Sequence, residues 1–523
     1  MAILCSGCLK PLWRVTQPWG AMIPPHAHLA RGVPVHRPDE RPDPHRWRAL
    51  WVTLVAGFMT LLDVTIVAVA LPSMQRELHA SAASVQWVVS GYALAFALTL
   101  VTAGRIGDAF GRRRVFLVAL AAFVACSAAA GAAPGIELLV VARLAQGVAA
   151  GSLAPQNSAL IQQMFQGAER GRAFGFFGAT VGVSSAVGPV VGGLILALAG
   201  PGGWRWIFYV NVPVGLLALL LGLRLLPRVA PGGRGRLDPV GVALLGVGIL
   251  AVMLPLVLAE GGGMGKVWWL FPAGLLVLAA FARWERRVAR RDGEPLLDPG
   301  LFTEARGYVT GAGLAALYFV GFSGVWLVFA LFFQNGLGFS PLRSGLAVTP
   351  FAVGSAIAAA VAGRLVERLG RLLTVWGLVA VMAGLGVTTL VLWLAPADRA
   401  VWLAAPALLV GGLGSGCVIS PNITMTLREV PVRMAGAAGG ALQTGQRLGG
   451  AIGTAALPGL FYLTLNATHG DYQDAVALSV GTGVAAMLCA LTVAVLDWRR
   501  DRSDGAGRCP PETSHSHTHA GQG

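Results

Sequence analysis

Charged residues are scarce in this 523-residue chain. Asp, Glu, Lys and Arg together make up 12% of it, whereas 55% of the residues are hydrophobic and the mean hydropathy is +0.68. Soluble domains carry roughly 25% charged residues, so this chain has too few to cover a water-facing surface. The low charge excludes a soluble globular protein, and the high apolar content excludes an intrinsically disordered one. The composition instead indicates membrane-spanning helices, each about 20 apolar residues long.

Signatures of catalysis and of metal binding are also absent or weak. The chain has no Walker-type Gly-Lys-Ser/Thr segment, no paired histidines inside an apolar run and no polar stretch long enough for a soluble domain. These absences count against ATP-driven transport, against an enzyme, and against a membrane sensor, the alternative from another functional class. The Cys5-x-x-Cys8 pair lacks a second half, and the tail histidines His515, His517 and His519 would hold a metal only loosely. We therefore expect no cofactor and no metal.

Fourteen apolar stretches are long enough to span a bilayer as helices. Because these stretches account for most of the chain, the sequence predicts an all-α polytopic membrane protein with fourteen transmembrane helices. The expected spans lie near residues 48–71, 84–106, 115–133, 136–158, 172–199, 205–225, 240–259, 267–283, 308–333, 345–366, 372–395, 401–426, 435–463 and 475–497.

Basic residues are distributed unevenly over the loops between these spans. With the N-terminus inside, the cytoplasmic loops hold 21 basic residues and the opposite loops hold 5. Basic loops stay in the cytoplasm, so this bias places both termini there and supports an even number of spans. The formal net charge of +15 therefore indicates topology and contact with membrane lipids rather than a nucleic-acid surface.

Two glycine-rich signatures recur along the chain at nearly the same offset. The segment 104–112 resembles 363–371, 259 residues later, and glycines 188 and 192 are echoed by glycines 449 and 453, 261 residues later. Repeated halves are common in secondary transporters, and an offset of eight helices indicates two spans inserted between two six-helix halves. We also expect residues 1–45 to be dispensable, with Met22 as an alternative start. The predicted parts are a disordered cytoplasmic tail, the N-terminal six-helix half, two inserted helices with a cytoplasmic linker, the C-terminal six-helix half and a second disordered cytoplasmic tail, at 1–46, 47–226, 227–300, 301–498 and 499–523.

Five motifs resemble those of the major facilitator superfamily and, within it, the 14-helix drug:proton antiporters. The resemblance runs from residue 48 to residue 500. Ala68 stands where the family usually has Asn, and Ala109 stands where it usually has a basic residue. The motifs are LDVTIVAVALP at 62–72, GRIGDAFGRRR at 104–114, RLAQG at 143–147, GPVVGG at 188–193 and WRWIFYVNVP at 204–213.

The resemblance implies a function and a mechanism. A member of this family exports a lipophilic drug or antibiotic across the plasma membrane in exchange for protons, by alternating access between two halves. The resemblance further implies a bacterial inner-membrane protein that is monomeric and is driven by the proton gradient without a cofactor. Its partners would be a small lipophilic substrate, protons and membrane lipids, with no nucleic acid. A proton-coupled symporter, or an exporter of one endogenous metabolite, is the alternative with the same fold.

Asp63 is the only carboxylate well inside any predicted span. A charge at the bilayer centre costs about 2.5–3.5 kcal/mol, so such a residue is usually functional. Counting the helical rise places Asp63 and Arg143 at similar depths, and the resemblance makes their helices neighbours. We hypothesise that Asp63 carries the coupled proton, that Arg143 sets its proton affinity and that Gln146, one turn along, is a polar partner. A static ion pair that only joins two helices is the alternative.

The position of Arg447 in a span, and the resemblance for two motifs, suggest roles for further residues. Arg447, in the middle of span thirteen, either faces a cavity, where it would attract anionic groups, or is a hydrogen-bonded structural arginine. Because no span interior contains a second carboxylate, we expect a neutral, zwitterionic or monocationic substrate. An antiporter motif, expected to form a bendable seal between the halves, comprises Gly182, Gly188, Pro189, Gly192 and Gly193. A cytoplasmic gate loop comprises Gly104, Asp108, Gly111, Arg112 and Arg113.

Overall fold

The computed structural model describes residues 44–200, 202–228, 238–259, 264–291, 293–303, 305–396 and 399–506. Within these ranges nearly every residue is helical and no strand is present, which confirms the all-α class predicted from the sequence. The helices are α1 (Arg46–Glu77), α2 (Ala82–Phe110), α3 (Arg112–Gly131), α4 (Ile136–Met164), α5 (Gly167–Ala199), α6 (Trp204–Tyr209), α7 (Asn211–Leu225), α8 (Pro239–Ala259), α9 (Met264–Val267), α10 (Leu270–Ala289), α11 (Gly300–Thr303), α12 (Arg306–Leu331), η1 (Phe332–Gly336), α13 (Pro341–Leu369), α14 (Arg371–Leu394), α15 (Ala400–Thr426), η2 (Val432–Met434), α16 (Ala435–Ala467) and α17 (Tyr472–Ala506).

Twelve helical segments in the described ranges are long and apolar enough to cross a membrane. Helix α1 has 32 residues, so at 1.5 Å per residue it is about 48 Å long, more than the roughly 30 Å of a hydrocarbon core. The two other predicted spans, 172–199 and 267–283, coincide with α5 and α10. The count of fourteen spans stays a prediction.

Several element boundaries differ from those predicted. The span predicted at 205–225 divides at Val210 into α6 and α7, because Pro213 has no N–H to donate to the carbonyl of Tyr209. Helix α17 continues to Ala506, past the tail boundary predicted at 499, because residues 499–504 contain neither proline nor glycine. The expectations for the remaining tails, including the N-terminal cysteines, Met22 and the tail histidines, fall outside the described residues.

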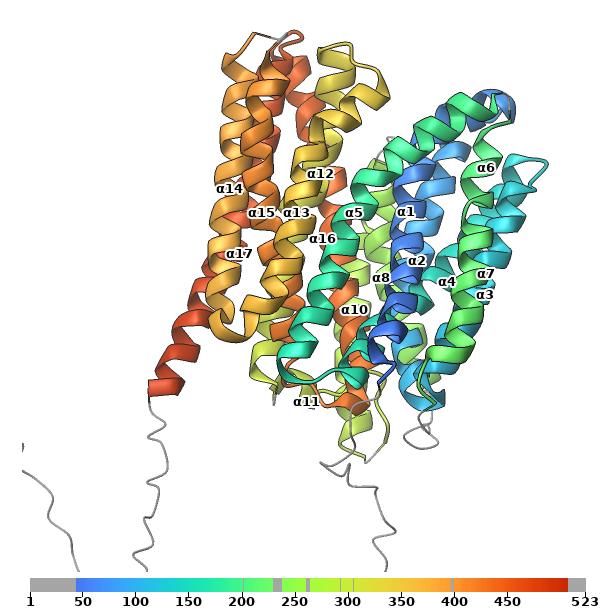
Figure 1. Cartoon of the computed structure of the whole chain (residues 1–523), viewed down its shortest axis with the longest axis vertical. Coiled ribbons are helices and arrows are strands. Elements are labelled where there is room, and N and C mark those ends of the chain that lie inside the picture. The colour runs from blue at the N-terminus through green and yellow to red at the C-terminus, as the bar shows by residue number, and fades with distance from the viewer. Residues whose placement is uncertain are drawn as a thin grey trace, which may run out of the picture. The chain divides into compact units, whose positions relative to one another are not determined.

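Helices α1 to α7 form the N-terminal half (Figure 1). Within it α2 and α3 pack on α4, and α1 packs on α5 and α7. Glycine permits close contacts between these helices: a Cβ added at Gly151 of α4 would lie 3.1 Å from the Cα of Phe96 on α2. Large side chains such as Phe123, Trp204 and Phe208 are fully buried in the cores of this half.

Helices α12 to α17 form the C-terminal half, in which α13 and α14 pack on α15, and α12 packs on α16 and α17 (Figure 1). A Cβ added at Gly384 of α14 would lie 2.5 Å from the Cα of Gly411 on α15, so only glycine fits at this crossing. Phe329 and Phe332 are buried in a core that is rich in aromatic side chains.

The inserted helices α8 and α10 pair with each other and contact both halves. Trp284 Nε1 on α10 donates a hydrogen bond to Asp238 Oδ2 at the start of α8, at 2.6 Å. Helix α8 packs against α2 of the N-terminal half and α16 of the C-terminal half. Its Leu245 and Ile249 belong to a hydrophobic core that includes residues of both halves. The insertion therefore lies along the junction between the halves.

Four helix pairs join the halves directly: α5 packs on α13 and α15, and α16 packs on α2 and α4. A Cβ added at Gly175 of α5 would lie 2.9 Å from the carbonyl oxygen of Ala359, and one added at Gly363 of α13 would lie 2.5 Å from that of Gly171. Side chains at these positions would push the helices apart. Small residues allow this kind of close contact between membrane helices.

Candidate functional site

A buried hydrogen-bond network surrounds Asp63 on α1. The Asp63 carboxylate is fully buried and forms an ion pair with Arg143 of α4, which is also fully buried. Gln146 Nε2 donates to Asp63 Oδ1 at 3.1 Å, and Asn211 Nδ2 of α7 donates to the same oxygen at 3.2 Å. The structure thus brings together the three predicted residues Asp63, Arg143 and Gln146. Asn211 is a fourth member that the sequence analysis missed.

The guanidinium of Arg143 is held by several further contacts. Its Nε donates to the carbonyl of Val88 at 2.9 Å, and its Nη1 donates to Gln146 Oε1 at 2.8 Å. Its Cζ lies 4.1 Å from the ring centroid of Tyr92, whose hydroxyl donates to the carbonyl of Thr60 at 3.2 Å. Its Nη2 is buried and has no hydrogen-bond partner among the described residues. The arginine is therefore tightly positioned but keeps one unused donor.

The Asp63 carboxylate and the Arg143 guanidinium compensate each other's buried charge. Removing one member of a buried ion pair typically costs about 3–5 kcal/mol, because the other charge is left uncompensated. A proton on Asp63 would neutralise the carboxylate and leave Arg143 as an uncompensated buried cation, while Gln146 and Asn211 would still have an oxygen to which they can donate. The two states would therefore differ chiefly in how strongly α1 holds α4.

Asp108, at the end of α2, connects the two halves. Its carboxylate accepts hydrogen bonds from the N–H groups of Gly436 at 3.1 Å and Ala437 at 3.0 Å, in the first turn of α16. Arg112 of α3 donates to Asp108 at 2.8 Å and also to the carbonyl of Val432, just before α16. A carboxylate is stabilised at a helix N-terminus by the free N–H groups and the helix dipole. Both predicted gate residues therefore contact the C-terminal half.

The other predicted gate residues have different positions. A Cβ added at Gly104 would lie 2.6 Å from the carbonyl carbon of Gly436, so this glycine allows α2 and α16 to touch. Gly111 has a φ of 101° where α2 ends and α3 begins, a conformation that favours glycine. Arg113 donates to the carbonyl of Leu223 on α7 at 2.6 Å, so it remains within the N-terminal half.

The glycines of the predicted antiporter motif on α5 contact two different helices. A Cβ added at Gly182 would lie 3.1 Å from the N atom of Ala356 on α13, in the other half. A Cβ added at Gly188 would instead lie 2.7 Å from the Cβ of Thr65 on α1, and Gly192 also faces α1. The expected contact between the halves is therefore made by Gly182, whereas Gly188 and Gly192 pack inside the N-terminal half.

The motif consequently touches the helix that carries the buried carboxylate. Thr65 lies two residues after Asp63, and its Oγ1 donates to the carbonyl of Ser184 on α5 at 3.4 Å. Gly193 follows Gly192 in α5, which stays helical throughout this stretch. The side chain of Pro189 lies outside the described residues.

Arg447, on α16, reaches across to the N-terminal half. Its Cζ lies 4.3 Å from the ring centroid of Phe96 on α2. The rings of Phe96 and Tyr92 are 6.1 Å apart, and Tyr92 also contacts Arg143. Within the described residues Arg447 forms neither an ion pair nor a hydrogen bond. The alternative of a hydrogen-bonded structural arginine therefore has no support in these contacts.

A second buried ion pair lies in the C-terminal half. Arg371 begins α14 as Arg112 begins α3, and its Nε lies 2.6 Å from Asp497 Oδ2 on α17. Its Nη1 donates to Asn422 at 2.6 Å, and Thr310 Oγ1 donates to Asp497 at 2.8 Å. The sequence repeat indicates Arg371, which corresponds to Arg112. It does not indicate Asp497, which lies at the end of a span, where charges are common.

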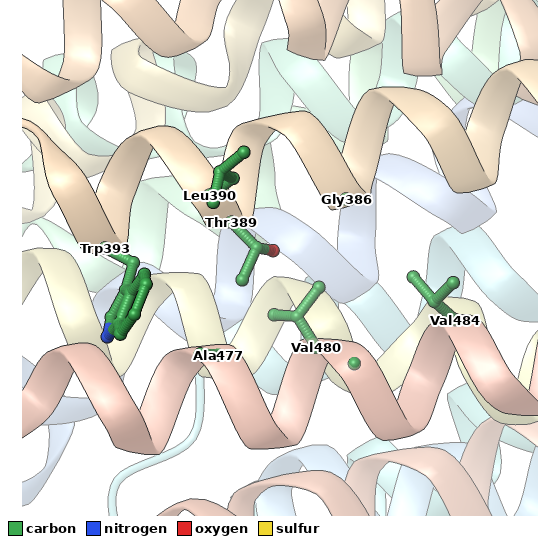
Figure 2. A pocket seen from close by; sticks show the side chains of 8 residues that line it. Gly386, Thr389, Leu390, Trp393, Ala477, Val480 and Val484 are labelled. Atoms are coloured by element: carbon green, nitrogen blue, oxygen red, sulfur yellow. The ribbon is translucent and has the colours of Figure 1, made fainter.

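A groove of about 270 Å³ lies between α14 and α17, and Figure 2 shows the side chains that line it. Leu390 and Trp393 of α14 and Val480 and Val484 of α17 line it, and Thr389 supplies a hydroxyl. No charged residue lines this groove, and none of the predicted site residues does. It is therefore separate from the buried network around Asp63 and offers no group that carries a proton.

Comparisons with known proteins agree with this architecture. The family description "Major Facilitator Superfamily" matches residues 53–454. The puromycin resistance protein pur8 of Streptomyces alboniger is 39% identical over 490 residues, which cover 89% of this chain and 94% of that relative. The probable actinorhodin transporter of Streptomyces coelicolor is 36% identical over 455 residues, which cover 86% of this chain and 78% of that relative. The solved structure of the proton:xylose symporter XylE bound to 6-bromo-6-deoxy-D-glucose is similar with a TM-score of 0.60 and 17% identity, covering 85% of this chain and 94% of that one. This last similarity concerns the fold alone.

Proposed function

The chain belongs to the major facilitator superfamily, and on this basis we propose that it is a proton-coupled antiporter that exports a lipophilic drug or antibiotic by alternating access. The family and the relatives indicate a transporter rather than an enzyme. The relatives described above are named for puromycin resistance and for probable actinorhodin transport. These names support an antibiotic or another lipophilic compound as the substrate.

The observation that carries the proposal is the burial of Asp63 together with Arg143. Both side chains are fully buried, and the carboxylate accepts hydrogen bonds from three helical residues of the same half. Charged side chains inside a membrane protein are costly to bury, so those that are present usually have a function. A carboxylate that can exchange its partner for a proton is suited to couple a proton gradient to movement.

The glycine contacts of α5 suggest how this site acts on the rest of the protein. Protonation of Asp63 removes its attraction for Arg143 and so loosens the contact between α1 and α4. Helix α5 packs on α1 through Gly188 and on α13 through Gly182, so a shift of α1 reaches the junction of the halves. The contact of Asp108 with the first turn of α16 then has to break for the halves to rock.

The proposal also covers the membrane, the topology and the partners of the protein. The apolar helices and bacterial relatives place the chain in the inner membrane as a multi-pass protein. The arginine bias supports both termini in the cytoplasm, in which case the Asp108 contact closes the cytoplasmic side. We further propose that the protein acts as a monomer without a cofactor or a metal. Protons, a small lipophilic substrate and membrane lipids are its proposed partners, and nucleic acid is not among them.

Everted vesicles from an efflux-deficient bacterium that expresses the full chain test the function. A chemically varied antibiotic panel identifies compounds to which the chain gives resistance. In respiring vesicles the lumen is acidic, so an antiporter releases protons when such a compound is added. We expect this release with the wild type and its loss with Asp63→Asn, which keeps the shape of the side chain but cannot ionise. Asp474→Asn, at an exposed position on α17, serves as the matched control.

The outcomes separate the alternatives. Proton release that persists in Asp63→Asn contradicts the coupling role and leaves a static ion pair. Substrate that moves together with the proton, instead of against it, favours a symporter. Absence of any resistance that depends on Asp63 favours export of one endogenous metabolite.

A further inference from the structure

One face of α16 is directed at the N-terminal half. Gly436, Gly440, Gln443 and Arg447 are spaced by four, three and four residues, so they share this face. A Cβ added at Gly440 would lie 2.5 Å from the carbonyl oxygen of Leu100 on α2, which means that the backbones touch there. One turn further along α16, the contact is made by side chains. At Arg447 the contact with α2 is likewise made by side chains.

The side chains of Gln443 and Arg447 have different partners. Gln443 Nε2 donates to the carbonyl of Ala154 at 3.3 Å and to Ser158 Oγ at 3.4 Å on α4. Arg447 has only the ring of Phe96, at 4.3 Å, and its side chain is partly exposed. In contrast to Arg143, it has no carboxylate partner among the described residues. The Arg447 guanidinium, which has no carboxylate partner in the described ranges, thus lies between the two halves.

The charge near Arg447 is not neutralised by the Asp63 network. Arg143 and Arg447 contact the adjacent rings of Tyr92 and Phe96, which lie one turn apart on α2. Asp63 pairs with Arg143, so the described residues around this ring pair carry one surplus positive charge. A cation in a desolvated setting attracts an anionic group strongly. The exposed part of Arg447 is where such a group can approach.

Aromatic side chains lie on the neighbouring helix. A Cβ added at Gly450, in the turn after Arg447, would lie 3.0 Å from Ser323 Oγ on α12. Phe319 and Phe322 precede this serine on α12 by four residues and by one residue, their ring centroids are 6.0 Å apart, and both are partly exposed. Flat apolar surface and a single cation are therefore found close together on α12 and α16.

We propose that Arg447 is a substrate subsite that binds the acidic group, a carboxylate or an ionised phenol, of an aromatic substrate. The inference rests on the proposed export function and narrows its substrate class. Among the neutral, zwitterionic and monocationic substrates expected from the sequence, a subsite of this kind favours the zwitterions. It also adds simple aromatic acids to the expected substrates. Because Arg447 belongs to one half and Phe96 to the other, the anion would bind at a contact that changes when the halves rock.

Three pyrene probes that differ only in charge test this subsite. They are 1-pyrenebutyrate, 1-pyrenebutanol and (1-pyrenylbutyl)trimethylammonium, and their binding to the purified full chain in detergent at pH 8 is followed by energy transfer from tryptophan. A hydrogen-bonded charge pair contributes about 1.5–3 kcal/mol, so we expect the wild type to bind the butyrate at least about tenfold more tightly than the butanol. Arg447→Gln is expected to remove this preference without weakening the butanol.

A matched variant controls for loss of a positive charge. Arg343, at an exposed position on α13, also stacks on a ring, with Cζ 3.9 Å from the centroid of Phe339. Arg343→Gln should leave the preference unchanged. If Arg447→Gln does not fold, as judged by gel filtration, then Arg447→Lys carries the test. The lysine should weaken the butyrate severalfold and leave the butanol alone, whereas equal weakening of all three probes overturns the subsite.

The result is distinguishable from a failure of the proposed function. A preference for the butyrate that survives in Arg447→Gln overturns the subsite, as does a wild type that prefers the butanol or the ammonium, or binds no probe. Resistance that depends on Asp63 would leave the export function standing in each of these cases. A preference that depends on Arg447, in a chain that gives no resistance, supports the subsite and contradicts drug export.

Discussion

Asn211 on α7 donates a hydrogen bond to the carboxylate of Asp63 on α1, with its Nδ2 3.2 Å from Asp63 Oδ1. The same Nδ2 lies 3.2 Å from Ser127 Oγ on α3, and that hydroxyl donates to the carbonyl of Phe208 at 2.9 Å. Asn211 and Ser127 are both buried, so these bonds form away from water. The carboxylate is therefore tied to α3 and α7 as well as to α4.

Asn211→Ala should weaken both the fold and the coupling. A buried partner left unsatisfied costs about 1–3 kcal/mol, so we expect the free energy of unfolding to fall by that amount. Proton release in vesicles should also fall, because the carboxylate loses one of the groups that position it. Asn466→Ala, at an exposed position near the end of α16, is the control for both measurements. A lower Tm with unchanged proton release would restrict Asn211 to a structural role.

The sequence predicts the charged part of this network but not the amide from α7. Asp63 and Arg143 are noticeable because charges inside an apolar run are costly. Asn211 is a neutral amide in a motif of the family, and a residue of this kind is cheaper to bury and so less distinctive. Helical rise gives the depth of each residue, but only packing shows that α1, α4 and α7 meet at one point.

The sequence likewise predicts the helices of the fold but not which helices touch each other. Apolar length predicts most helices, and the missing N–H of Pro213 accounts for the unexpected break between α6 and α7. The resemblance groups Gly182, Gly188 and Gly192 in one motif of α5. It does not reveal that Gly182 contacts α13 whereas Gly188 and Gly192 contact α1, because that depends on where neighbouring helices lie.

Gly436→Val should prevent the halves from closing where α2 meets α16. A Cβ at this position would lie 2.5 Å from the carbonyl oxygen of Gly104, and a branched side chain needs more space still. We expect transport to be lost, with the protein still inserted and folded. Labelling of a cysteine placed at Val101 should increase, since this buried residue of α2 lies at the contact with α16 and would become accessible. Gly459→Val is the matched control on the same helix, because a Cβ there meets nothing within 4 Å. Unchanged labelling would contradict closure at this contact.

Gly188→Leu should abolish transport by separating α5 from α1. Even the Cβ would lie 2.7 Å from the Cβ of Thr65, two residues from the buried carboxylate. The loss is expected in vesicle transport, while the amount of protein in the membrane stays similar. Gly246→Leu on α8 adds the same side chain where a Cβ meets nothing within 4 Å, and it should retain activity. Normal transport by Gly188→Leu would exclude a requirement for this helix contact.

Asp497→Ala should strongly destabilise the C-terminal half. It removes the Asp497 carboxylate, whose Oδ2 lies 2.6 Å from Arg371 Nε in the wild type. Losses of one member of a buried ion pair are about 3–5 kcal/mol, and they appear as a lower Tm. The double variant Arg371→Met/Asp497→Leu should be more stable than Asp497→Ala, because it removes the buried guanidinium together with the carboxylate. Equal melting of the two variants would show that the broken ion pair is not the cause. Asp474→Ala, at an exposed site on the same helix, is the control.

Glu285 lies on α10, just beyond the end of the predicted span 267–283. Its side chain is buried, and its Oε2 accepts a hydrogen bond from the N–H of Leu297 at 2.9 Å. Its Oε1 has no hydrogen-bond partner among the described residues. Burial, together with the nearby charge of Asp238, raises the pKa of the Glu285 carboxyl from 4.5 to about 7, although the Leu297 bond acts in the opposite direction. The folded protein therefore holds this proton at pH values where the unfolded chain has already released it.

The raised pKa of Glu285 gives a definite pH dependence of stability. Between pH 4.5 and about 7 the folded state binds more protons than the unfolded state, so the free energy of unfolding contributed by this group falls as the pH rises through that window. Above it, both states are ionised and the loss is complete. Glu285→Gln cannot ionise and can still accept the Leu297 hydrogen bond. We expect it to raise the Tm at pH 8 and to leave the Tm almost unchanged below pH 4.5, where the wild-type carboxyl is protonated in both states. An equal gain at both pH values would attribute the effect to packing instead of to the charge.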